Sequence, residues 1–142
     1  MKDAVISLDI GGTSIKGAII NKEGDILYKD NFNIEANFTS EEHKTNISNI
    51  IKKLLENMPS EYRAIGIGLD CPGVMNSETL HMGGAENVPG LHGIKFSDIG
   101  DLFDLPVRTA NDASMAALGE AKYGSGKDKE YKSVMFVTLG TG

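Results

Sequence analysis

Glycine is unusually frequent in this chain and lies at the ends of its apolar segments. Seventeen of the 142 residues are glycine, against a usual share of about 7%. They have no fixed period and cluster at residues 11–12, 66 and 68, 83–84, 124 and 126, and 140 and 142. A residue without a Cβ lets the backbone turn tightly and approach a neighbour closely. The pattern therefore predicts strands that end in tight turns with close backbone approach.

The first 34 residues predict an antiparallel meander. Residues 4–10 are nearly all apolar, which is typical of a strand covered on both faces. Residues 14–20 form a second, isoleucine-rich strand, and residues 25–34 form a third that is more polar and therefore nearer an edge. Short turns join the three strands, so neighbours in sequence are expected to pair antiparallel.

Helical spacing replaces this pattern in the next segment. Apolar residues recur on one face at Ile47, Ile50, Ile51, Leu54, Leu55 and Met58. This spacing predicts a helix over about 40–58. Thr39 and Glu42 match the capping box at its start, and Pro59 ends it. A second buried strand follows at 64–69, and the strand–helix–strand order predicts a parallel crossover.

The second half of the chain predicts two more helices and two more strands. Residues 74–95 consist mainly of loops, with a hairpin around 76–78. The remaining predicted elements are a helix over 96–103, a strand over 106–110, a helix from 111–112 to about 123, and a buried strand over 133–139. A glycine turn directly after a buried strand leads us to expect more chain. We therefore interpret the 142 residues as one lobe of a longer protein.

Charge and composition exclude several classes of function. The formal net charge is −6 and the sequence pI is about 5.0, and an acidic surface repels phosphate backbones, so we expect no general nucleic-acid binding. No apolar run reaches about 18 residues, so we expect no membrane span. A single cysteine excludes an intrachain disulfide or a four-cysteine metal site held by this chain alone. It also predicts a reducing, cytoplasmic compartment.

The cysteine and the histidines show no ligand spacing. Cys71 lies beside a turn and is interpreted as a small buried apolar residue. The three histidines, His43, His81 and His92, are far apart in sequence. We expect them on the surface or in loops, not around a metal ion.

Two segments share the design of an apolar strand followed by a glycine turn with a threonine. In Asp9-Ile10-Gly11-Gly12-Thr13, the backbone N–H groups and the threonine hydroxyl can form an anion site. Asp9 is placed to hold Mg²⁺ through water. Leu139-Gly140-Thr141-Gly142 repeats the design. Because α/β sheets bind ligands at the carboxyl ends of their strands, the two turns predict a phosphate site. The alternative for the first turn is a hairpin with a solvated aspartate.

Asn111 and Asp112 lie where a predicted strand meets a predicted helix. The simpler interpretation is an N-cap pair, a common role for these residue types. The functional interpretation is that Asp112 accepts the proton of a hydroxyl whose oxygen attacks a phosphorus atom. A helix N-terminus favours a negative charge at this position.

These motifs also occur in an order that resembles a known family. The matching segments are 9–13, 66–68, 72–73, 111–113, 117–120, 124–127 and 137–142. In this order they resemble the amino-terminal lobe of ROK-family sugar kinases, a group of bacterial glucokinases, fructokinases and N-acetylmannosamine kinases with related sugar-sensing repressors. The resemblance implies an α/β, actin-like (ribonuclease-H-like) ATPase fold. Such a fold has a mixed sheet with a meander, parallel crossover strands and helices on both faces, and two lobes close on ATP and sugar.

The resemblance also implies roles for single residues. The ATP phosphates and Mg²⁺ are assigned to Asp9, Gly11, Gly12, Thr13, Gly140, Thr141 and Gly142. Asp112 matches the general base for phosphorylating a hexose hydroxyl, and Asn111 matches a residue that binds sugar hydroxyls. Gly73 and Asn87 lie in loops that border the sugar site. The implied ligands are therefore ATP, Mg²⁺ and a hexose such as glucose, fructose or N-acetylmannosamine.

Parts of the family pattern fall outside these residues or differ from them. A second lobe would carry the adenine pocket, further sugar ligands and a structural zinc site. The full-length protein is expected to form a homodimer, and the isolated lobe is expected to be inactive. Leu69-Asp70-Cys71 stands where many members have a small or apolar stretch before Pro-Gly, and Glu86 precedes Asn87, so the exact sugar stays open.

Two other functions stay open beside the kinase. One is a non-catalytic sugar-sensing module of the repressor branch. The other is a different actin-like ATPase, in which Asp112 would only cap a helix. The intact Asp9 turn and Asp112 favour the kinase, because a sensor needs neither phosphate chemistry nor Mg²⁺.

Overall fold

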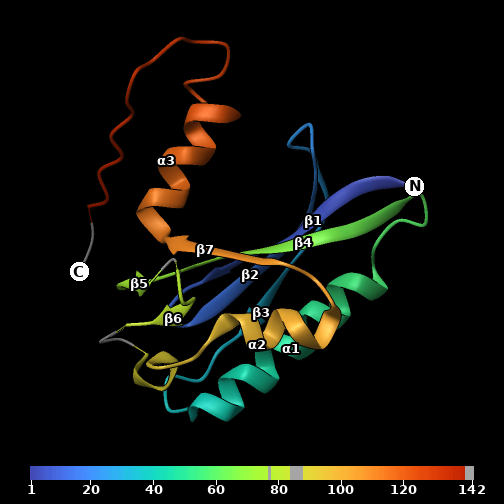
Figure 1. The fold of residues 1–142 in the computed structure, drawn as a ribbon, viewed down its shortest axis with the longest axis vertical. Helices are drawn as coiled ribbons and strands as arrows, with labels where there is room; N and C mark the ends of the chain where they lie inside the picture. Colours follow the sequence, from blue (N-terminus) through green and yellow to red (C-terminus); the bar gives the residue numbers. More distant parts are fainter. Residues whose placement is uncertain (77, 84–87, 140–142) are drawn as a thin grey trace.

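The computed structural model describes residues 1–76, 78–83 and 88–139, built around a five-stranded mixed sheet (Figure 1). Its strands are β1 (Lys2–Ile10), β2 (Ser14–Asn21), β3 (Ile26–Asn33), β4 (Tyr62–Cys71) and β7 (Val107–Asn111), in the order β3-β2-β1-β4-β7. The other elements are helix α1 (Ser40–Glu56), the hairpin strands β5 (Met75–Asn76) and β6 (His81–Met82), the 3₁₀ turn η1 (Pro89–Leu91), helix α2 (Phe96–Phe103) and helix α3 (Asp112–Lys122). The predicted meander and parallel crossovers are confirmed.

Strand direction brings three strand ends to one edge of the sheet. β1 pairs antiparallel with β2, and β2 pairs antiparallel with β3. β4 runs parallel to β1 on one side and to β7 on the other. The carboxyl ends of β1, β4 and β7 therefore meet at the same edge, which is where α/β sheets bind ligands.

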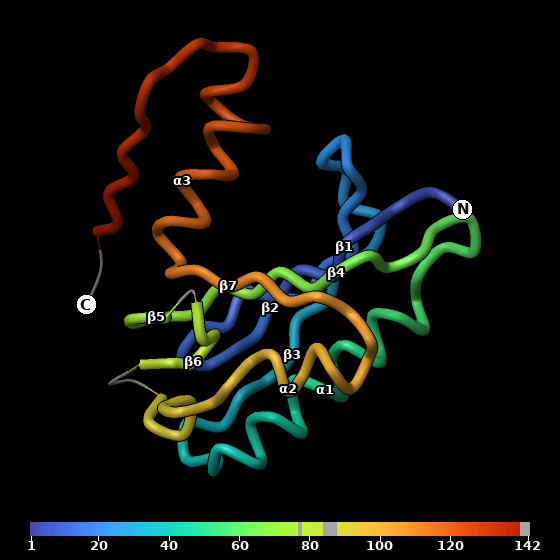
Figure 2. Tube along the Cα trace, viewed as in Figure 1, coloured from blue at the N-terminus to red at the C-terminus, as the bar shows by residue number. Residues whose placement is uncertain are grey.

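One face of the sheet is fully packed. Along β1, Ile6, Leu8 and Ile10 are buried, and they share one core with Ile51 and Leu54 of α1. The residues between them on β1 are only half-buried, because they point to the other face. The expectation that residues 4–10 are covered on both faces is therefore wrong for the second face. Helices α1 and α2 lie on the packed side (Figures 1 and 2).

Helix α1 begins at the capping box expected from its sequence. The Glu42 amide donates to Thr39 Oγ1 at 3.2 Å, and the Thr39 amide donates to Glu42 Oε2 at 2.7 Å. Two N–H groups that the helix leaves unpaired are thereby satisfied. The helix ends at Glu56, two residues before the predicted end, and Asn57 caps it.

Helix α3 rises from the end of β7 on the side of the sheet opposite α1 and α2 (Figure 1). Residues of the sheet and of α3 line an open hollow of about 940 Å³. This space, called the α3 hollow here, is lined by residues of β1, β4 and α3 that include Ser7, Asp9, Gly68, Asp70, Asp112 and Ala116. None of the helix residues is buried. The helix thus borders the open face without packing tightly against it.

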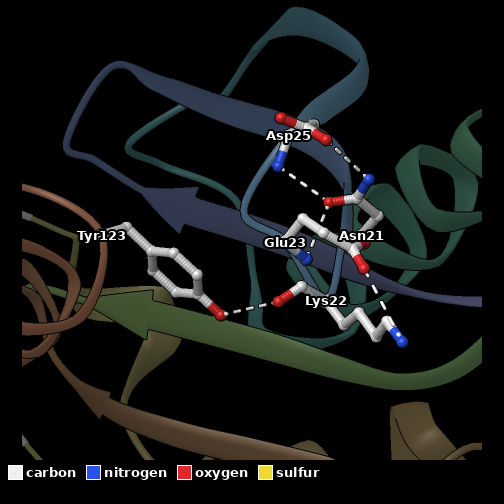
Figure 3. Close-up of polar contacts among 5 residues, drawn as sticks. All are labelled: Asn21, Lys22, Glu23, Asp25 and Tyr123. Atoms are coloured by element: carbon white, nitrogen blue, oxygen red, sulfur yellow. Dashed lines mark hydrogen bonds and ion pairs between the residues drawn. The ribbon is translucent and has the colours of Figure 1, made fainter. Parts of the chain in front are cut away.

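The far end of α3 rests on the turn between β2 and β3 (Figure 3). Tyr123 donates a hydrogen bond from its hydroxyl to the Lys22 carbonyl oxygen at 3.4 Å. Its ring lies against Gly24, where an added Cβ would come within 2.6 Å of the ring and where φ is +90°. The Asn21 side-chain oxygen holds this turn by accepting from the amides of Glu23 and Asp25 at 3.1 and 2.8 Å.

The predicted buried strand over 133–139 is not formed. This segment has no strand pairing and runs back beside α3 as an irregular chain (Figure 2). Its apolar side chains are exposed, with Met135 at 88% and Leu139 at 94%. An apolar run becomes a strand only when a partner strand satisfies its backbone groups. Helix α3 carries the chain away from the sheet after β7, so these residues meet no partner in the described part of the chain.

Two smaller expectations had different outcomes. Cys71 is buried and free, as predicted. His43 was expected on the surface but is 0% exposed, on the buried face of α1 and with its ring edge-on to Phe38 at 5.4 Å. His81 and His92 are exposed. None of the helices in the described residues combines the length and the apolar character needed to cross a bilayer.

Candidate functional site

Three acidic residues lie where the parallel strands end. In the strand register, Asp9 of β1 is opposite Asp70 of β4, and Asp70 is opposite Ala110 of β7. Asp112 follows β7 as the first residue of α3. All three acids line the α3 hollow. Sequence reasoning placed Asp9 and Asp112 at this edge, and the structure brings them to the same space.

The turn after β1 is closed by its own backbone. The Gly11 amide donates to the Ser14 carbonyl oxygen at 2.9 Å, and a Cβ on Gly11 would lie 3.0 Å from the same oxygen. Thr13 is exposed, and Gly12 is half-buried. The turn is therefore tight enough to favour glycine, and its outer side is accessible to a ligand.

Asp9 is a partly exposed residue at the end of β1 and forms an ion pair. Its Oδ2 pairs with Nζ of Lys16, its neighbour on β2, at 3.1 Å. Both side chains are substantially exposed, at 45% for Asp9 and 68% for Lys16, so the pair is a weak and solvent-accessible one. Carboxylate oxygens are hard donors of the kind Mg²⁺ prefers, so the chemistry of Asp9 fits the proposed cation.

Asn111 is the residue that caps α3. Its Oδ1 accepts from the Ala113 amide at 3.0 Å, and its Nδ2 donates to the Gly73 carbonyl oxygen at 3.0 Å. The cap interpretation is therefore right for Asn111, which also ties α3 to the loop after β4. Gly73 has a φ of +95°, a conformation that favours glycine. Gly73 and Asn111 line a smaller hollow of about 390 Å³.

Asp112 is exposed at the start of α3. One oxygen, Oδ1, accepts from the Ala113 amide at 2.7 Å. The carboxylate lies in the first turn of α3, where the helix dipole stabilises a negative charge. It also lines the α3 hollow. A carboxylate at such a position can accept a proton from a hydroxyl bound beside it.

Asp70 was singled out in the sequence only as a departure from the family pattern. Burial raises its pKa to about 7, with further contributions from the charge of Asp9, a hydrogen bond between the two carboxyl groups and the charge of Asp112; Lys16 acts in the opposite direction. Its Oδ1 is buried and has no hydrogen-bond partner in the described part of the chain. An acid near the end of a largely apolar strand is the signal that could have drawn attention to it, whereas its position beside Asp9 comes from the register of β1 and β4.

Four predicted site residues lie outside the described residues. They are Asn87 of the sugar loop and Gly140, Thr141 and Gly142 of the second glycine turn. Among the described residues, no group of three or more His, Cys, Asp or Glu side chains could hold a metal ion. Residues 1–76, 78–83 and 88–139 therefore do not form a metal centre with three or more His, Cys, Asp or Glu ligands.

The sheet order, the crossover helices and the ligand edge define an α/β domain with the actin-like ATPase fold. A model of the ROK family matches residues 5–142, and the chain belongs to this family. The chain is 34% identical to a glucokinase of Halalkalibacterium halodurans over 139 residues. This match covers 96% of the chain and 41% of that enzyme. The chain is 27% identical to a xylose repressor of Bacillus spizizenii, covering 96% of this chain and 35% of the repressor.

A solved structure shares this arrangement. It is a ROK family glucokinase from Streptomyces griseus in complex with glucose and AMPPNP, with a TM-score of 0.72 and 26% identity. The match covers 88% of this chain and 38% of that one. The chain therefore spans about two fifths of the length of these relatives. They include both kinases and repressors, so the family alone does not choose between the two functions.

Proposed function

We propose that residues 1–142 are the amino-terminal lobe of an ATP-dependent kinase that phosphorylates a hexose hydroxyl. The observation that carries the proposal is the meeting of Asp9 and Asp112 on one hollow at the carboxyl edge of the sheet. Asp9, which leads into the predicted phosphate turn, and Asp112, the candidate general base, both line this space. The comparison with glucokinases supports the same reaction.

In this proposal, residues of the turn after β1 and of the start of α3 each have a part in phosphoryl transfer. The turn at Gly11 and Gly12 would hold the ATP phosphates with backbone N–H groups. Asp112 would take the proton of the attacking hydroxyl, and Asn111 would orient the sugar from its cap position. Bound with ATP, Mg²⁺ would neutralise charge on the phosphates. Closure of a second lobe would complete the positioning and exclude water.

The test is hexose-dependent ADP formation by the protein that carries these residues together with its second lobe. Glucose, fructose and N-acetylmannosamine are offered separately. Asp112→Asn should lower kcat by at least about 100-fold, the usual scale for loss of a general base, while the Kd of the hexose changes little. Asp98→Asn is the matched control, because Asp98 is also a first-turn acid of a helix and lies on α2, on the packed side of the sheet.

Three results would contradict the proposal. A near-normal kcat in Asp112→Asn would mean that Asp112 is not the general base and acts only at the start of the helix. Hexose binding without ADP formation would indicate the sensing function of the repressor branch. ADP formation that needs no hexose would indicate a different actin-like ATPase.

A further inference from the structure

Asp70 is the acidic residue of this edge to which the proposed reaction gives no role. It lies on β4 directly beside Asp9 of β1 in the parallel register. The charge of Asp9 contributes to the raised pKa of Asp70. Both line the α3 hollow. Asp70 is thus in contact with the first predicted phosphate turn, through Asp9.

The two carboxylates are poorly compensated by the residues around them. In the described part of the chain, the cation that faces them is Lys16, and it pairs with Asp9 Oδ2 from an exposed position. Asp70 Oδ1 is buried without a hydrogen-bond partner among the described residues. A buried carboxylate oxygen without a partner is costly, and a second negative charge beside it adds to that cost. A bound cation would reduce both the cost of the unpaired oxygen and the repulsion between the two carboxylates.

We propose that Asp70 is a second carboxylate ligand, beside Asp9, for the divalent cation that accompanies ATP. This inference rests on the proposed function, because that function supplies the cation and the phosphates. The orphaned Oδ1 of Asp70 and the carboxylate of Asp9 are hard oxygen donors, which suit Mg²⁺.

The number of acids also fits this cation. Mg²⁺ is usually held by one or two carboxylates, with waters and substrate phosphates in its other positions. Asp112 acts on Asp70 through its charge, and the described residues contain no group of three or more such side chains that could hold a metal ion. The arrangement is therefore a pair that faces the α3 hollow, where the phosphates would complete the coordination, and Asp112 stays free to act on the hydroxyl.

The test is the binding of Mn²⁺ alone to the purified chain of residues 1–142, measured by electron paramagnetic resonance of the free ion. Asp70→Asn and Asp9→Asn should each weaken Mn²⁺ binding by about tenfold or more, the scale for losing a group that holds a metal. Asp112→Asn is the matched control, since it removes the same charge from the same edge. It should weaken binding by no more than about threefold at physiological ionic strength, because screening limits an effect through space.

A second measurement separates a lost ligand from a lost fold. MgCl₂ should raise the Tm of the wild-type chain, because a ligand that binds only the folded state stabilises it, and this rise should disappear in Asp70→Asn. Without metal, Asp70→Asn should unfold at the same or a higher temperature, since the repulsion with Asp9 is gone.

Several outcomes would overturn the inference. One is Asp70→Asn binding Mn²⁺ within threefold of the wild type, and another is Asp112→Asn losing as much affinity as Asp70→Asn. Absence of Mn²⁺ binding by the wild-type chain is a third. If Mn²⁺ binding depends on Asp70 but no hexose-dependent ADP formation is found, the proposed kinase function is contradicted and the metal site is not. If the protein is an active kinase but its Mn²⁺ affinity is unchanged in Asp70→Asn, the role of Asp70 as a metal ligand is contradicted and the kinase function is not.

Discussion

Two glycines inside helices should respond in opposite ways to the same substitution. Gly100 lies inside α2 and Gly119 inside α3. Replacing glycine by alanine in a helix interior favours the helix by about 1 kcal/mol in both cases. The surroundings differ, because an added Cβ meets no atom within 4 Å at Gly119 but two close atoms at Gly100.

The clash at Gly100 outweighs the gain in helix propensity. A Cβ there would lie 2.5 Å from Val107 Cγ2 and 2.6 Å from the Leu105 carbonyl oxygen. The second atom is backbone, and Leu105 is also tied to α2 by a hydrogen bond from its amide to the Gly100 carbonyl oxygen at 3.1 Å. Relief therefore requires α2 and the start of β7 to move apart, and such overpacking costs about 1–3 kcal/mol.

The expected free energies of unfolding follow from these two terms. Gly100→Ala should be less stable than the wild type by up to about 2 kcal/mol, and Gly119→Ala should be more stable by up to about 1 kcal/mol. Urea unfolding followed by circular dichroism measures both, with the m-value checking that the transition stays the same. If Gly100→Ala were stabilised as much as Gly119→Ala, the close packing of α2 on β7 would be refuted.

Two further predictions concern the phosphate turn and the buried histidine. Gly12→Val places a side chain on the turn beside Asp9, so the KM for ATP should rise while the Kd of the hexose stays similar; unchanged ATP kinetics would make the turn purely structural. Burial lowers the pKa of His43, so the unfolded chain binds the proton more readily, and the contribution of His43 to the free energy of unfolding should fall as pH falls below about 6.5. Asp70, whose pKa is raised to about 7, acts in the opposite direction in this range, so the effect of His43 is the difference between the pH profiles of the wild type and His43→Phe. In His43→Phe this loss of stability between pH 7.5 and 5.5 should shrink, whereas His81→Gln, at an exposed position, should keep it; equal slopes in all three proteins would contradict the burial of His43.

Features encoded by near neighbours could be predicted from the sequence alone. The capping box of α1 joins residues three apart, and its buried face repeats at helical spacing, so both depend on backbone geometry that every helix shares. The meander could be predicted because short turns join consecutive strands, which then pair antiparallel. The edge that carries Asp9 and Asp112 could be predicted as well, because parallel strands connected by crossovers end on the same side.

Features that depend on distant partners were decided only by the tertiary structure. Residues 133–139 are apolar enough for a strand, yet no strand lies beside them in the described chain. The open second face of β1 depends on how far α3 stands from the sheet. His43 is buried because it lies on the face of α1 that packs into the core. Asp70 meets Asp9 through the register between β1 and β4, and a register joins residues about 60 positions apart, which no local pattern in the sequence can set.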